Sequence, residues 1–113
     1  MRQPKIKQAV LVVPTYNEID NLEELIHRLQ DAITAVGRYK VSILIVDDNS
    51  SDGTGELALK FATVYNNVFL IQGEKKGLGD AYIRGFKYAI NNLRADALMQ
   101  MDADLSHDPK DVP

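Results

Sequence analysis

The sequence contains no cysteine, little net charge and no long apolar run. Without cysteine the chain has neither disulfides nor thiolate ligands for zinc, which is compatible with the cytosol. The formal net charge is −3 and the basic residues at the start are confined to residues 1–7, so nothing favours nucleic-acid binding. The longest apolar run, residues 9–13, is far shorter than the roughly 20 residues of a membrane span, and no signal peptide precedes it. These absences predict a soluble protein that binds no nucleic acid.

The residues that are present predict one globular domain. The chain has 113 residues, of which 45% are hydrophobic, enough for a single core. Four short, mainly apolar runs, the first three of them rich in β-branched residues, are typical of buried strands: residues 9–13, 41–46, 68–71 and 97–101.

Segments with helical periodicity separate these runs. The inward-facing positions expected for the first helix are Leu22, Leu25, Ile26, Leu29, Ile33 and Val36, with Asp20 or Asn21 as its cap and Gly37 at its end. Those expected for the second helix are Leu57, Ala58, Phe61 and Ala62, and those for the third are Tyr82, Phe86, Ala89, Ile90 and Leu93.

Alternating strands and helices predict an α/β fold, an open, doubly wound and mostly parallel sheet over residues 1–113, because short crossovers make neighbouring strands parallel. Near the end, Asp108-Pro109 resembles a helix start with only a few residues after it. We therefore expect this domain to be C-terminally truncated.

Polar residues follow every predicted strand, at residues 14–18, 47–54, 73–79 and 102–104. In such a sheet these loops meet at one edge, where ligands bind at the point at which the strand order reverses. Asp102 and Asp104 project to the same side if the chain stays extended, and paired carboxylates suit Mg²⁺ or Mn²⁺. An exposed pair of loop acids is the alternative for an isolated motif of this kind.

The remaining polar positions leave alternatives open. One of Asp47 and Asp48 can accept hydrogen bonds from a base or ribose while the other caps the turn with Ser50, Ser51 and Asp52. Tyr16 can stack on a base or pack, and Glu18 can hold the nucleoside or stabilise a helix start. The loop with Lys75, Lys76, Gly77 and Gly79 fits phosphate binding or an ordinary turn, and His107 fits a loop role better than zinc binding.

Three motifs in this order resemble the inverting family-two glycosyltransferases with the GT-A fold: Pro14-Thr15-Tyr16-Asn17-Glu18, the segment from Val46 to Thr54, and Asp102-Ala103-Asp104. Within that family, the stretches from Glu74 to Tyr82 and from Met101 to Pro109 are similar to dolichyl-phosphate or polyprenyl-phosphate mannose synthases. The resemblance covers nearly the whole chain from Ala9 onward.

The resemblance implies transfer of mannose from GDP-mannose to a polyprenyl (dolichyl) phosphate with inversion, assisted by Mg²⁺ or Mn²⁺. It implies that the guanosine is held by Pro14, Tyr16, Glu18, Val46 and Asp48, and the metal and diphosphate by Asp102, Ala103 and Asp104. The resemblance further implies that Ser106 adds a metal contact and that Asp104 is the catalytic position through the metal. Asn49 replaces the usual glycine, and asparagine tolerates the same left-handed turn.

The resemblance also implies that acceptor-binding and membrane-facing parts lie beyond residue 113, so we expect weak GDP binding and little activity from this chain. The expected location is cytoplasmic, peripheral at the cytosolic face of a membrane (the endoplasmic reticulum in a eukaryote), with a membrane-anchoring partner or self-association through an open strand edge. A UDP-sugar donor and a non-catalytic nucleotide-binding module remain alternatives. A dinucleotide oxidoreductase and a P-loop NTPase are excluded, because the glycine-rich motif that each requires is absent.

Overall fold

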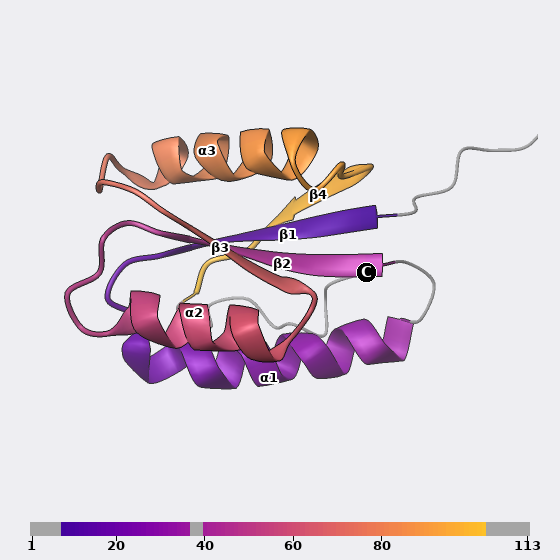
Figure 1. The fold of residues 1–113 in the computed structure, drawn as a ribbon, viewed down its shortest axis with the longest axis horizontal. Helices are drawn as coiled ribbons and strands as arrows, with labels where there is room; N and C mark the ends of the chain where they lie inside the picture. The colour runs from indigo at the N-terminus through magenta and orange to yellow at the C-terminus, as the bar shows by residue number, and fades with distance from the viewer. Residues whose placement is uncertain (1–7, 37–39, 104–113) are drawn as a thin grey trace, which may run out of the picture.

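The structure is a computed structural model that describes residues 8–36 and 40–103. Strands and helices alternate along the chain, as predicted. The strands are β1 (Gln8–Thr15), β2 (Lys40–Asp47), β3 (Val68–Gln72) and β4 (Ala97–Gln100), and the helices are α1 (Ile19–Val36), α2 (Thr54–Val64) and α3 (Leu78–Asn91). Figure 1 shows α1 and α2 on one face of the sheet and α3 on the other. Among the described helices, none has the length and apolar character needed to cross a bilayer.

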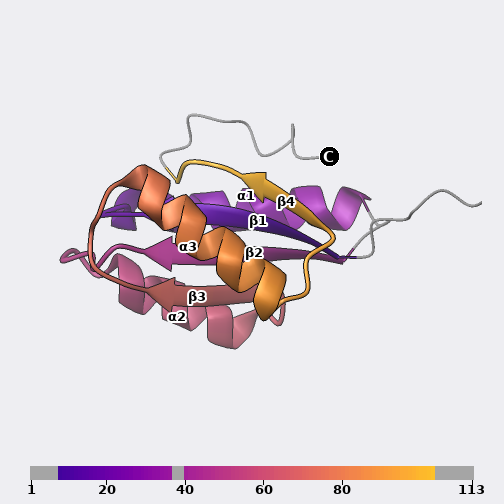
Figure 2. The same ribbon diagram turned by 90° about the horizontal axis from the view of Figure 1, so that it is seen from above.

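The sheet is parallel throughout, with the strand order β3-β2-β1-β4. The chain moves outward from β1 through β2 to β3 and then returns to add β4 on the other side of β1, as seen from above in Figure 2. The order therefore reverses between β1 and β4. In a sheet of this kind the crevice beyond the carboxyl ends of those two strands is the expected ligand site.

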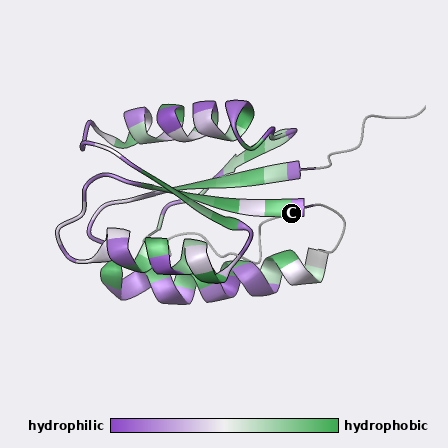
Figure 3. Ribbon diagram, in the orientation of Figure 1, coloured by the Kyte–Doolittle hydropathy of each residue, from purple (hydrophilic) through white to green (hydrophobic). Residues whose placement is uncertain are grey.

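The central strands β1 and β2 are buried on both faces of the sheet, because helices cover each face. Figure 3 shows these two strands as mostly hydrophobic ribbons. Leu11 and Val13 of β1 pack on the side of α1 and α2, and Val10 and Val12 pack on the side of α3. Each fully buried aliphatic side chain contributes about 1.5–3 kcal/mol through removal from water. The continuous apolar run, rather than an alternating one, follows from this double burial.

The α3 face contains small residues where the helix approaches the sheet. Ala81, Gly85 and Ala89 are its buried positions, and a Cβ on Gly85 would overlap Val12 and lie 3.0 Å from Cγ2 of Val46. Glycine is required here by the close approach of the helix to β1 and β2. The prediction that Ile90 faces inward was wrong, because its side chain is 54% exposed.

Other boundaries differ by small amounts from the predictions. Met101 lies one residue beyond β4, although it is buried, and Leu93 lies beyond the end of α3. Helix α1 begins at Ile19, so Asp20 and Asn21 lie inside it and do not cap it. Gly37 and Asp108-Pro109, predicted to end and to begin helices, lie outside the described residues.

Candidate functional site

A cavity of about 370 Å³ opens at the carboxyl ends of β1 and β4, where the strand order reverses. This volume lies within the range of small-molecule sites. Loops that follow all four strands contribute to its wall, together with the first residue of α3. The lining residues are Pro14, Thr15, Tyr16, Glu18, Asp48, Lys75, Gly77, Leu78, Asp102 and Ala103.

The structure brings most of the predicted site residues together at this cavity. Those that line it are Pro14, Tyr16, Glu18, Asp48, Asp102 and Ala103. Val46 does not line it, since its side chain is fully buried in the cluster beneath α3. Asp104 and Ser106, the predicted metal ligands after Asp102, and His107 lie outside the described residues.

The neighbouring acids at the end of β2 have different environments. Asp47 is 1% exposed and its Oδ1 accepts hydrogen bonds from the hydroxyls of Thr15 at 2.7 Å and Ser50 at 2.6 Å. Its Oδ2 accepts the Ser50 backbone N–H at 3.0 Å. Asp47 therefore holds the turn after β2, and Asp48 is the acid of this pair that lines the cavity.

Asp48 is paired with an arginine from α3. Arg84 Nη2 donates to Asp48 Oδ1, and Arg84 Nε donates to Asp80 Oδ2 at 2.8 Å. The pKa of Arg84 is raised, and the hydrogen bond to Asp48 is the largest cause. Burial of the guanidinium acts to lower the pKa, and the hydrogen bond to Asp80 acts to raise it further. The guanidinium therefore remains charged and neutralises Asp48 at the cavity wall.

Hydrogen bonds join the loop after β1 to the loop after β2. The backbone N–H of Asn17 donates to Ser50 Oγ at 2.9 Å, and Asn17 Oδ1 accepts the backbone N–H of Ser51 at 2.9 Å. Asn17 and Asn49 both adopt left-handed backbone, with φ of 53° and 58°. The predicted left-handed turn at Asn49 is confirmed, and the two loops form one joined wall of the cavity.

The start of α1 is capped by side chains from the loop after β2 and the first residue of α2. The backbone N–H of Glu18 donates to Thr54 Oγ1 at 2.9 Å, and that of Ile19 donates to Asp52 Oδ2 at 3.1 Å. Desolvation acts to raise the pKa of Asp52, but hydrogen bonds from the Thr54 hydroxyl and from the backbone N–H groups of Ile19 and Thr54 outweigh it, so the pKa is lowered. Asp52 thus stays ionised at the positive end of α1.

Tyr16 provides an aromatic surface at the cavity. Its side chain is 41% exposed, and Lys75 Nζ lies 3.8 Å from the ring centroid. This cation–π contact connects the loop after β1 to the loop after β3. Lys75 is the positively charged side chain among the lining residues, beside the carboxylates of Glu18, Asp48 and Asp102.

Asp102 is positioned by a tyrosine from α3. The Tyr82 hydroxyl donates to Asp102 Oδ1 at 2.9 Å, and the Tyr82 ring stacks on Phe86 with centroids 5.8 Å apart. A carboxylate at a cavity mouth is the hard oxygen ligand that Mg²⁺ and Mn²⁺ prefer, with substrate phosphates and water completing the shell. Within residues 8–36 and 40–103 no cluster of three or more acidic, histidine or cysteine ligands occurs.

Arg84 was not predicted as a site residue, and Tyr82 was predicted only as an inward-facing residue of the third helix. The spacing of Asp80 and Arg84 at i and i+4 is a signal for an ion pair on a helix. Nothing in the sequence indicates that Arg84 also contacts Asp48, which lies in the loop after β2. That contact depends on where α3 crosses the sheet.

Residues 10–113 match the family model described as glycosyl transferase family 2. A dolichol-phosphate mannosyltransferase of Pyrococcus furiosus is 40% identical over 103 residues, which cover 91% of this chain and 27% of that protein. An undecaprenyl-phosphate mannosyltransferase of Micrococcus luteus is 39% identical over 107 residues, which cover 94% of this chain and 42% of that protein. The chain thus spans less than half the length of these relatives.

The fold is similar to that of a solved mannosyltransferase of Pyrobaculum calidifontis, determined in complex with GDP-Man and Mn²⁺. The TM-score is 0.67 at 26% identity, over 85% of this chain and 27% of that one. The α/β fold class and the family resemblance predicted from the motifs are confirmed. With a family model covering nearly the whole sequence, the chain belongs to glycosyl transferase family 2.

Proposed function

We propose that this chain is the donor-binding unit of a glycosyltransferase that moves mannose from GDP-mannose to a polyprenyl phosphate, with inversion and with Mg²⁺ or Mn²⁺. The cavity at the strand-order reversal carries the proposal, because one aromatic ring and three carboxylates converge there from separate loops. The similarity to two polyprenyl-phosphate mannosyltransferases supports the choice of sugar and acceptor.

The guanosine binds at the wall formed by the loops after β1 and β2. Tyr16 offers a ring face for stacking on the base, as aromatic side chains do with nucleobases. Asp48 is an acceptor-only group, so it receives hydrogen bonds from the N–H donors of guanine or from the ribose hydroxyls. Glu18 adds a second acceptor at the same wall.

The diphosphate lies toward β4 and the start of α3. Gly77 and Leu78 place the N-terminal end of α3 at the cavity, where the helix dipole favours anions. Lys75 adds a positive charge, and Asp102, with Asp104 after it, would hold the metal. When bound, the divalent cation stabilises the negative charge that develops on the departing diphosphate.

The transfer step requires little from a general base. The bond between mannose C1 and the GDP oxygen breaks with its electron pair leaving on GDP, while an acceptor phosphate oxygen forms the new bond on the opposite face of C1. A phosphate monoester is largely ionised at neutral pH, because its second pKa is about 6. The residues of this chain therefore act by binding and orienting the donor.

Since the acceptor is a lipid, we place the enzyme peripherally at the cytosolic face of a membrane.

Calorimetry with GDP, GDP-mannose and UDP, each with and without Mn²⁺, tests this function. We expect the two guanosine ligands to bind more tightly than UDP, and Mn²⁺ to strengthen GDP binding by about tenfold or more. Asp104→Ala should remove that gain. The matched control is Asp31→Ala, which removes an exposed carboxylate from α1 that does not line the cavity, and it should bind like the wild type.

Each alternative gives a different result in the same titrations. Binding of UDP as tight as that of GDP would favour a UDP-sugar donor, and a metal gain that survives in Asp104→Ala would remove that residue from the metal site. We also expect little mannosyl transfer to polyprenyl phosphate by residues 1–113. Full turnover would show that these residues suffice for the reaction.

A further inference from the structure

Helix α3 contacts two of the three carboxylates that line the cavity. Arg84 reaches Asp48, on the guanosine side, and Tyr82 reaches Asp102, on the diphosphate side. Neither Arg84 nor Tyr82 is among the residues that line the cavity. We infer that Arg84 and Tyr82 are positioning residues, through which α3 sets the charge and orientation of the two acids for the nucleotide and for the metal. This inference rests on the proposed function.

The ion pair between Arg84 and Asp48 reduces the negative charge at the cavity. Three carboxylates line the cavity against one lysine, and a nucleoside diphosphate is itself an anion. An unpaired charge on Asp48, whose side chain is 8% exposed, would repel that ligand at short range in a poorly solvated position. With its Oδ1 bonded to Arg84, Asp48 keeps acceptor capacity for the nucleoside while its charge is neutralised.

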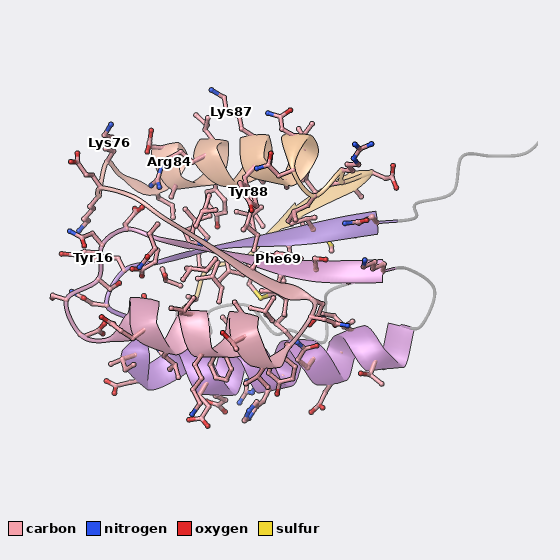
Figure 4. The ribbon with its side chains drawn as sticks, viewed as in Figure 1. Tyr16, Phe69, Lys76, Arg84, Lys87 and Tyr88 are labelled. Atoms are coloured by element: carbon pink, nitrogen blue, oxygen red, sulfur yellow. The ribbon has the colours of Figure 1, made fainter. Side chains whose placement is uncertain are left out.

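The position of the guanidinium is built into the loop after β3. A Cβ on Gly73 would lie 2.5 Å from Arg84 Nη1, so any larger residue at this position would displace the guanidinium from where it lies. Asp80 then binds Nε one helical turn earlier at 2.8 Å. The arginine is therefore fixed from three sides, by Asp48, Asp80 and the bare backbone of Gly73. Figure 4 shows its guanidinium beneath α3 toward the loops, whereas Lys87 points away from the sheet.

The tyrosine acts on the other acid in a comparable way. Its hydroxyl bonds Asp102 Oδ1, and stacking on Phe86 restricts the ring. Groups that hydrogen-bond a metal ligand orient it, and their loss typically lowers metal affinity by 10–100-fold. Because Tyr82 and Arg84 touch different acids, their removal should affect different parts of the ligand.

The test is calorimetry of GDP binding by the purified chain, with and without Mn²⁺, for Arg84→Met and Tyr82→Phe. Arg84→Met keeps the aliphatic stem and should weaken GDP binding about tenfold in both conditions. Tyr82→Phe should leave metal-free binding unchanged and lower the Mn²⁺-dependent gain about tenfold. Gly73→Ala retains Arg84 but displaces it, and should reproduce part of the loss seen in Arg84→Met.

Two controls on the same helix separate positioning from charge and folding. Lys87→Met removes an equal positive charge, and Tyr88→Phe removes a hydroxyl, from residues that do not line the cavity. Both should bind GDP like the wild type, and a thermal melt should show each variant folded. Wild-type GDP affinity in Arg84→Met, or a wild-type Mn²⁺-dependent gain in Tyr82→Phe, would overturn the positioning role of that residue and leave the proposed function standing. No binding of GDP by the wild-type chain would overturn both.

Discussion

Single residues at the cavity show how adjacent side chains of the same type acquire different roles. Asp47 and Asp48 are identical in chemistry, yet Asp47 accepts hydrogen bonds from Thr15 and Ser50, whereas Asp48 accepts one from Arg84. Their chemistry alone left open which of the two would hold the turn, whereas the family resemblance implied Asp48 for the nucleoside. Alternation along β2 determines the answer, and so does the position of α3, which no local pattern encodes.

Asp52 carries a prediction for pH dependence at the residue scale. Its pKa is lowered in the folded chain, so the ionised carboxylate stabilises the fold above the ordinary aspartate pKa of about 3.9, and this contribution is lost as the pH falls through the lowered folded pKa. We therefore expect Asp52→Asn to lower the melting temperature between pH 5 and 8. The difference from the wild type should shrink toward zero in stronger acid.

Melting curves of both proteins, measured from pH 8 down to pH 2, check this expectation. Glu56→Gln, in the first turn of α2, is a control that removes one exposed carboxylate which forms no hydrogen bond to α1. A deficit in Asp52→Asn that stays constant down to pH 2 would show that the charge of Asp52 is not what stabilises the start of α1.

Among the elements, α3 shows the limit of periodicity as a guide. Its helical pattern predicted the element, but the expected inward stripe included Ile90, which is exposed, and omitted Gly85, which is buried. Periodicity ranks side chains by hydrophobicity, whereas the sheet selects for small size where a helix crosses closely. The strands were predicted to within a few residues because double burial makes them continuous apolar runs.

The close crossing of α3 predicts opposite effects for two glycines of the same helix. Gly85→Ala should destabilise the chain by about 1–3 kcal/mol, because the added methyl group overlaps Val12 beneath the helix. Gly79→Ala meets no atom within 4 Å and should be neutral or stabilise by about 0.5–1 kcal/mol through helix propensity. Urea unfolding measures both, and equal midpoints for the two variants would contradict the close packing.

At the scale of the whole molecule, the sequence predicted the place of the cavity and most of its lining residues, but not the contacts that those residues make. Alternating elements and polar loop motifs located the ligand edge, since the carboxyl ends of parallel strands meet there. The contacts made by Lys75 with Tyr16, and by α3 with both acids, arise only when separate crossovers pack on one sheet. Residues 104–113, which include the expected ligands Asp104 and Ser106, lie outside the described part of the chain.

Ligand binding should stabilise the folded chain as a unit, because the cavity wall draws on loops after all four strands. At a GDP concentration ten times its calorimetric Kd, with saturating Mn²⁺, the expected gain is about 1.4 kcal/mol. For a chain of this size that corresponds to a rise in Tm of about 6 °C. Differential scanning calorimetry measures it, with Mn²⁺ alone as the reference. An unchanged Tm under these conditions would mean that GDP binds without preference for the folded cavity.

The strand order also affects how the chain folds while the ribosome synthesises it. β1 is made first and occupies an inner place in the sheet, but its neighbour β4 is made last of the described strands, with Ala9 facing Ala97. A nascent chain that has released only β1 through β3 lacks Asp102 and the side of the cavity it forms. We expect a ribosome-bound chain to acquire nucleotide affinity abruptly, when β4 emerges and inserts beside β1.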